Sequence, residues 1–329
     1  MNSQLQSKLN LFVENTHGIK DDFIWQQPMA KRLASLTYTL EGKAINSEAI
    51  KECHALIKSE VGTFSTFRGN MAVYIAAALS LRENPKELLA HTLEVYELLK
   101  QEGFWASDYL VVTAYEIAAN TEPHNLGYMA ERTMAFYKEM KSNIRFHIGQ
   151  DDYIFAAMLA MSGIDIHAGG IELRHLVSQL KAEFSMFMPR GSIVTLAQML
   201  VLGQSTDACV EHMLKLNRVL RQKKIRLDRT YTLASMGVLG ILAVDTHAFA
   251  EDLIAARDYL RTQKGFGALF VSTPEIMLYG VSLIANMYST DKSTLNASVT
   301  TSITNLLIAQ QVAMITAITA ATTAAAASC

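Results

Sequence analysis

The chain has 329 residues and a mass of 36.4 kDa; half of its residues are hydrophobic and 18% are charged. This composition excludes an intrinsically disordered chain, which has few apolar residues and a high net charge. Lys and Arg number 29 against 31 Asp and Glu, and this balance gives no indication of a nucleic-acid surface. With only 17 Gly and 5 Pro to interrupt helices, we expect an all-α protein.

The start of the chain and its cysteines indicate the compartment. Residues 1–20 are polar and mixed in charge, unlike a secretory signal. Cys53, Cys209 and Cys329 are isolated and form no disulfide framework, so we expect a reducing cytoplasm. The apolar runs, such as 71–81, are shorter than the ~20 residues of a membrane span, so we expect no membrane partner for this part of the chain.

One pattern recurs about every forty residues: a polar turn, an apolar Ala-rich run, a break, and a charged amphipathic segment. A degenerate first copy covers 28–40 and 47–58. Later apolar helices are predicted to begin near Asn70, Asp108, Asp152, Ser192, Arg229 and Thr273. Their amphipathic partners are predicted at 86–100, 128–141, 171–183, 207–221 and 248–261.

This pattern predicts a stack of about seven αα-hairpins. The first helix of each hairpin is apolar nearly all round, so it is expected in an inner layer, with the amphipathic helix outside. An open α-solenoid and a closed α/α toroid both fit, and the apolar inner helices favour closure. No linker interrupts the pattern, so we expect one domain over 1–292, followed by a separate tail.

In this register, a rim of polar residues lies at the N-terminal ends of the inner helices. Helix capping by the aspartates and ion pairs between neighbouring repeats are the simplest interpretation, and a ligand site is the alternative. His147 with Asp151 and Asp152 fits an ordinary turn better than a metal or general-base cluster, so no metal site is expected. The candidate rim consists of Arg68, Asn70, Asp108, Tyr109, His147, Asp151, Asp152, Tyr153, Arg190, Asp228, Arg229 and Glu275.

The common catalytic motifs are absent. The sequence has no phosphate-binding loop, no dinucleotide fingerprint, no His-Glu-x-x-His and no nucleophile elbow. No catalytic residue and no cofactor is therefore assigned.

Four segments together resemble a known family. They read Thr-Phe-Arg-Gly-Asn at 66–70, Ser-Asp-Tyr-Leu at 107–110, Gly-Gln-Asp-Asp-Tyr at 149–153 and Ala-Gln-Gln-Val-Ala-Met-Ile at 309–315. The chain resembles DUF4003, a bacterial family of unknown function, over most of its length. The resemblance implies a bacterial cytoplasmic protein and brings no activity, cofactor or site residue.

The tail, 293–329, has no charged residue, no Gly and no Pro. We expect a weakly amphipathic helix that packs on the repeat, closes a ring or mediates self-association. A membrane anchor fits poorly because of Gln310, Gln311 and the threonines. The third alternative is a modified segment, as in a ribosomal-peptide precursor, with Ser328 and Cys329 as the candidate positions.

Three functions remain open at this point. The preferred one is a helical-repeat scaffold that binds a peptide or protein. The second is an enzyme or small-ligand binder that uses the rim, an inference from fold analogy. The third is a carrier whose tail is modified.

Overall fold

A computed structural model describes residues 3–144, 147–184, 188–204, 207–242, 244–291, 308 and 311–312. Within these ranges the protein is all-α, with fourteen α-helices, three short 3-10 helices (η1–η3) and no β-strand. None of the described helices combines the length and apolar character needed to cross a bilayer.

The even-numbered helices contain the predicted apolar runs. They are α2 (Pro28–Leu40), α4 (Ala72–Ser80), α6 (Asp108–Asn120), α8 (Tyr153–Met161), α10 (Arg190–Leu202), α12 (Ser235–Ile241) and α14 (Thr273–Asp291). Most begin within two residues of the predicted position. The exception is α12, which begins six residues after Arg229, because Thr232 turns back and donates its hydroxyl to the carbonyl of Leu227 at 2.7 Å.

From α3 onward, the odd-numbered helices contain the predicted amphipathic segments. They are α3 (Ser47–Glu60), α5 (Pro85–Glu102), α7 (Leu126–Asn143), α9 (Ile166–Glu183), α11 (Asp207–Gln222) and α13 (Thr246–Thr262). Helix α9 begins five residues before the predicted position, and α1 (Ser3–Ile19) was not predicted. The short helices are η1 (Thr66–Arg68), η2 (Pro123–Asn125) and η3 (Gln150–Asp152). All five prolines lie at or just before the start of a helix or 3-10 turn, where a missing N–H is tolerated.

The two kinds of helix differ in burial. Every residue of α4 from Ala72 to Leu79 is buried, and so is every residue of α8 from Tyr153 to Ala160. In α5 the buried residues instead recur at helical spacing on one face, as in Leu89, Thr92, Val95, Tyr96 and Leu99. The apolar helices therefore form the core, and α5 covers it with one apolar face.

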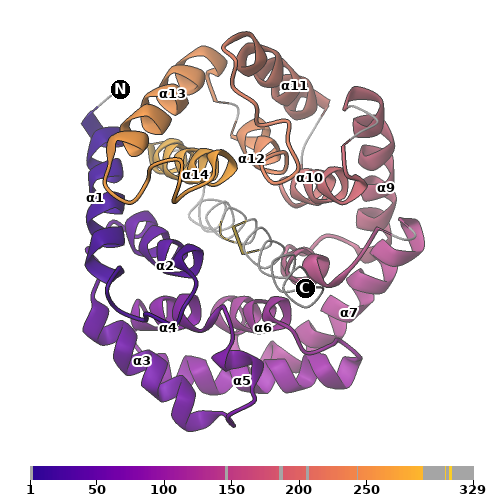
Figure 1. The fold of residues 1–329 in the computed structure, drawn as a ribbon. Helices are drawn as coiled ribbons and strands as arrows, with labels where there is room; N and C mark the ends of the chain where they lie inside the picture. The colour runs from indigo at the N-terminus through magenta and orange to yellow at the C-terminus, as the bar shows by residue number, and fades with distance from the viewer. Residues whose placement is uncertain are drawn as a thin grey trace, which may run out of the picture. The chain divides into compact units, whose positions relative to one another are not determined.

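Figure 1 labels the helices in chain order. The chain divides into two compact units, each described by itself. Unit 2 comprises residues 15–38, 44–171 and 311–329. Within it, α5 packs against α3, α4, α6 and α7, and α8 packs against α6 and α7. Helices of the same kind thus pack together, as α6 with α8 and α5 with α3 and α7 do, and helices of the two kinds pack against each other.

Unit 1 comprises residues 1–14, 39–43 and 172–310. Here α12 packs against α10, α11 and α14, and α13 packs against α11 and α14. Two glycines make the close approach of α12 possible: a Cβ on Gly237 would lie 3.2 Å from Met199, and one on Gly240 would lie 3.0 Å from the carbonyl of Cys209.

The tail lies mostly outside the described residues. Ile308, Gln311 and Val312 are described, and all three are helical and buried. Ser328 and Cys329 lie outside, so the expectations for the tail stay predictions.

Candidate functional site

Within unit 2, the structure brings several rim residues to the starts of the apolar helices. Asp108 and Tyr109 open α6, Asp151 and Asp152 form η3, and Tyr153 opens α8. Arg68 ends η1 and Asn70 follows it before α4, while His147 precedes η3. In unit 1, Arg190 opens α10, Glu275 lies in the first turn of α14, and Asp228 and Arg229 precede α12 by several residues.

Asp108 links two of these helix starts rather than capping its own. Its carboxylate accepts a hydrogen bond from Asn70 Nδ2 at 3.0 Å. The cap of α6 is Ser107, whose hydroxyl accepts from the backbone N–H of Leu110 at 3.2 Å, so the expected capping role of Asp108 is wrong. Burial raises the pKa of Asp108, and the hydrogen bonds from Asn70 oppose this shift. A Cβ on Gly69 would lie 2.7 Å from the Asp108 carboxylate, so the link depends on a glycine there.

Arg68 binds backbone carbonyls instead of an aspartate. One guanidinium nitrogen donates to the carbonyl of Lys58 at 2.5 Å and to that of Val61 at 2.9 Å, at the C-terminal end of α3. A cation is favourable there because the last carbonyls of a helix lack intrahelical partners. The helix end thus compensates this arginine, and the expected ion pair with a rim carboxylate is not formed among the described residues.

Asp152 closes the turn before α8. Its side chain is buried and accepts the N–H of Gly149 at 2.7 Å, whereas it makes no side-chain cap on α8 itself. The expected capping of α8 by Asp152 is therefore wrong, because the carboxylate points back into η3. Within the described part of the chain, no group of three His, Cys, Asp or Glu residues is arranged to hold a metal ion.

Tyr153 belongs to an aromatic cluster beside this turn. Its ring lies 4.7 Å from that of Phe104 and 5.2 Å from that of Tyr137, both in edge-on geometry. Its hydroxyl accepts the N–H of Trp105 at 3.4 Å. Burial and the nearby Tyr153 and Asp152 raise the pKa of Tyr137 far above its ordinary range, so this phenol stays neutral. The cluster holds the loop before α6 against α7 and α8.

In unit 1 the rim carboxylates also have local partners. The buried Asp228 accepts from Arg226 at 2.7 and 3.2 Å, and Arg221 lies 3.6 Å away. The expected capping of α12 by Asp228 is wrong, since Asp228 lies seven residues before that helix. Glu275 is buried and accepts the Tyr279 hydroxyl at 2.6 Å. The ion pairs of Asp228 are therefore made with Arg226 of its own loop and with Arg221 at the end of α11.

A buried carboxyl that the sequence analysis did not single out lies in unit 2. Glu116 is inside the apolar helix α6, where Tyr74 of α4 donates to one carboxyl oxygen at 3.3 Å and Asn120 to the other at 3.3 Å. Burial raises the pKa of Glu116 to about 7, against the opposing effects of the Tyr74 hydrogen bond and the charge of Arg82. The signal was an acidic residue in the middle of the apolar run 110–118.

Exposed apolar side chains on the loops of unit 2 were also missed. They are Ile24, Trp25, Phe64 and Trp105, which are between 70% and fully exposed. Each lies in a connection that leads from an odd-numbered helix to the next even-numbered one. Their signal in the sequence was the presence of large apolar residues in the turns between predicted helices, alone at Phe64 and next to other apolar residues at 23–25 and 104–106.

One family model matches the sequence of the chain. The model described as "Protein of unknown function (DUF4003)" matches residues 15–312, which is most of the chain. The chain belongs to the DUF4003 family. This confirms the resemblance seen in the sequence, and the matched range includes both the rim and the exposed loops of this DUF4003 protein. Comparison with curated proteins and with solved structures gave no match.

Proposed function

We propose that this DUF4003 protein is a helical-repeat scaffold that binds a peptide or protein through the loops at one edge of unit 2. The proposal includes an architecture of stacked αα-hairpins, as a curved solenoid or a closed toroid, in a bacterial cytoplasmic protein. It keeps 1–292 as one repeat domain and the tail, 293–329, as a segment for packing or self-association.

Bonds at or next to equivalent positions support the repeat. Asn70 and Asp108, which are equivalent and 38 residues apart, are linked by a hydrogen bond in unit 2. In unit 1, Ser192 donates its hydroxyl to the carbonyl of Thr230, the residue after the equivalent position Arg229. The alternation of fully buried and one-face-buried helices adds to this support. In such a stack the connections from outer to inner helices all lie at one edge.

The state of the rim argues for a structural role there. The carboxylates of Asp108, Asp152, Asp228 and Glu275 all accept hydrogen bonds from their own unit. Arg68 is bound to backbone carbonyls. A ligand at the rim would have to replace these bonds, so the enzyme or small-ligand alternative has less support than a scaffold.

The loops carry the proposal because two of them pair a buried aromatic residue with an exposed one. Phe104 is buried against Tyr137, and its neighbour Trp105 is 75% exposed. Phe67 is buried against Tyr96, while Phe64, three residues earlier, is fully exposed. The buried ring fixes the loop, so the exposed ring is presented without a large entropic cost on binding. Trp and Phe are enriched in the energetically important centres of protein interfaces.

Site-specific photo-crosslinking tests the proposal. A photoreactive phenylalanine analogue replaces Trp105, and in a matched protein it replaces Tyr128, which is 59% exposed on α7 away from these loops. In cells that express the protein natively, we expect a discrete cross-linked protein from position 105 and none from position 128. Equal labelling from both positions, or none from either, would contradict the proposal.

A further inference from the structure

The balanced net charge of the chain hides one strongly basic segment. Seven of the 29 Lys and Arg residues lie between positions 215 and 229, and the one acidic residue in that segment is Asp228. The segment covers the second half of α11 and the loop that leads to α12. We call it the α11 basic patch; it consists of Lys215, Arg218, Arg221, Lys223, Lys224, Arg226 and Arg229.

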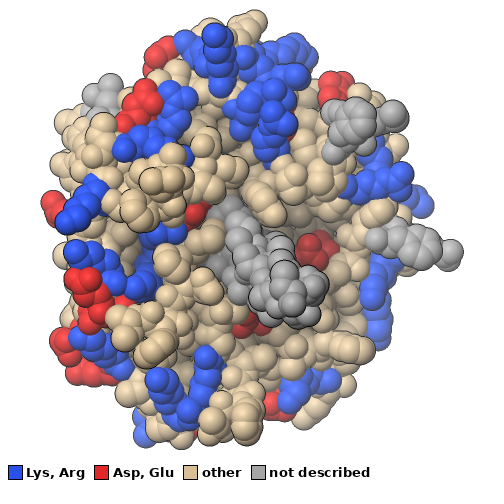
Figure 2. Space-filling view, viewed as in Figure 1, with Lys and Arg blue, Asp and Glu red and all other residues tan. Residues whose placement is uncertain are grey.

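The fold turns these cations to the surface. On α11, the exposed Lys215 and Arg218 lie on the face opposite to the buried Met213, Leu216 and Leu220. The loop then alternates: Lys224, Arg226 and Arg229 are exposed, whereas Ile225 and Leu227 are buried and hold the loop on the core. In the space-filling view, Lys and Arg side chains gather over α11 (Figure 2).

Only part of this charge is neutralised. Asp228 is bound by Arg226 and Arg221, and Lys223 forms an ion pair with Glu251 of α13. No carboxylate among the described residues lies within ion-pair distance of Arg218, Lys224 or Arg229. The helix dipole explains part of this accumulation of positive charge, because it favours a cation such as Arg221 in the last turn of α11. It does not explain Lys224, Arg226 and Arg229, which follow the helix.

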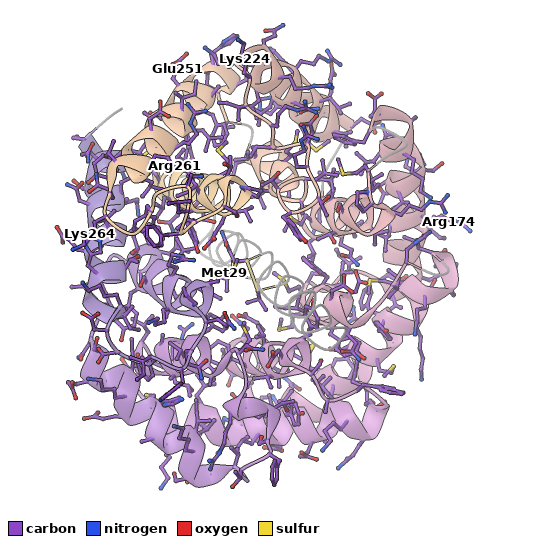
Figure 3. The ribbon with its side chains drawn as sticks, in the orientation of Figure 1. Met29, Arg174, Lys224, Glu251, Arg261 and Lys264 are labelled. Atoms are coloured by element: carbon purple, nitrogen blue, oxygen red, sulfur yellow. The ribbon has the colours of Figure 1, made fainter. Side chains whose placement is uncertain are left out.

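Lys224 also occupies a backbone position that suits glycine. Its φ is +59°, in the left-handed region. The N–H of Lys224 bonds to the carbonyl of Arg221 and the N–H of Ile225 to that of Leu220, the hydrogen bonds of a Schellman motif. At the end of α5 the same two bonds are made by Gly103, with φ +106°, and Phe104. A lysine therefore stands where the chain elsewhere uses the residue best suited to the conformation, and its side chain lies on the outer side of unit 1 (Figure 3).

We propose that the α11 basic patch binds the phosphodiester backbone of single-stranded nucleic acid, RNA or DNA. The patch has no exposed aliphatic side chain, since Val219, Ile225 and Leu227 are all buried, and the ring beside it, Tyr231, is only partly exposed. A protein partner or a bilayer is bound stably when larger apolar groups are buried as well. A phosphate backbone needs only the cations, and Arg suits phosphate well. Tyr231, 37% exposed and two residues beyond Arg229, supplies a ring on which a base can stack.

Fluorescence anisotropy with a labelled 20-nucleotide oligo(U) and an oligo(dT) of equal length tests the binding. The triple variant Arg218→Gln/Lys224→Gln/Arg229→Gln removes three cations that have no carboxylate partner. The matched control Lys138→Gln/Arg174→Gln/Lys181→Gln removes three exposed cations from α7 and α9. At about 100 mM salt we expect the triple variant to lose at least tenfold in affinity and the control less than twofold. Each phosphate contact contributes about 0.7 to the magnitude of the slope of log K against log salt concentration. Removing three cations should therefore lower the magnitude of this slope by about 2 in the triple variant.

Three results would overturn the proposal: no binding of either oligonucleotide by the parent protein at 50 mM salt, equal losses in both triple variants, or equally tight binding of polyglutamate of the same charge. Tighter binding to vesicles of phosphatidylcholine and phosphatidylserine would reassign the patch to a membrane surface. RNA and DNA are distinguished by comparing the two oligonucleotides directly.

Lys224→Gly separates function from folding. Because glycine suits the left-handed position, we expect the variant to raise the melting temperature by about 1–2 °C while weakening oligonucleotide binding about threefold. Changes of the same sign in stability and binding would mean that Lys224 acts only through the fold.

Discussion

Asn70 Nδ2 donates a hydrogen bond to the carboxylate of Asp108 at 3.0 Å and so joins the start of α4 to the start of α6. Replacing Asp108 with Ala leaves the partly buried Asn70 amide without this acceptor. We expect the free energy of unfolding to fall by about 1–2 kcal/mol, measured by urea denaturation. Asp258→Ala, which removes an exposed carboxylate beside Arg257, should change it by less than about 0.5 kcal/mol. Equal effects of the two variants would show that the link does not stabilise unit 2.

Phe104 and Trp105 are adjacent in sequence but have opposite environments. Phe104 is 4% exposed and packs on Tyr137 and Tyr153, whereas Trp105 is 75% exposed. Phe104→Ala should cost about 3–4 kcal/mol of unfolding free energy through the cavity it leaves. Trp105→Ala should change it by less than about 0.5 kcal/mol. Thermal denaturation of the two single variants checks this, and a comparable loss in both would contradict the separation of anchor and exposed ring.

Glu116 makes stability depend on pH near neutrality. Its pKa is about 7 in the folded protein and 4.5 as its ordinary value, so between these values the folded state keeps a proton that the unfolded state has lost. Stability therefore falls as the pH rises through this window. We expect Glu116→Gln to be more stable than the parent by about 2–3 kcal/mol at pH 8, with little of that gain left at pH 4.5.

Urea titrations at several pH values test this, with Glu87→Gln on the exposed side of α5 as the control. A gain from Glu116→Gln that is the same at pH 4.5 and pH 8 would mean that the carboxyl does not titrate in this window.

Arg68 stabilises the end of α3 through the carbonyls of Lys58 and Val61. Arg68→Met removes both hydrogen bonds and the charge, and we expect a loss of about 1–2 kcal/mol in unfolding free energy. Amide exchange should accelerate in the last turn of α3 and not in α5. Arg174→Met, a change at an exposed arginine of α9, is the matched control. Unchanged exchange at 57–61 would show that Arg68 does not hold this helix end.

Much of the fold could be predicted because it depends on burial. The run 71–79 is apolar at every position, which an inner helix requires, and α4 lies there. Helix α1 was not predicted, α9 begins five residues before the predicted position 171, and α12 begins six residues after Arg229. The start of α12 is set by the hydroxyl of Thr232, which bonds back to Leu227, and a single side-chain bond of this kind leaves no periodic trace in a sequence.

The rim positions could be predicted, but the partners of their side chains could not. Ser107 and Asp108 are both good capping residues, and only the geometry shows that Ser107 caps α6 while Asp108 reaches Asn70. A carboxylate partner was expected for Arg68, and the sequence carries no signal that backbone carbonyls at the end of α3 accept its hydrogen bonds instead. The clustering of cations around Lys224 was present in the sequence, but the net charge of the whole chain does not reveal a local cluster.

The most direct test of the scaffold proposal is the affinity of the protein cross-linked from position 105. Isothermal titration calorimetry would compare the parent with Trp25→Ser/Trp105→Ser and with Tyr128→Ser. We expect at least a tenfold weaker affinity for the double variant, unchanged affinity for Tyr128→Ser, and equal melting temperatures for all three proteins. Affinity retained by the double variant would contradict a partner site on the loops of unit 2.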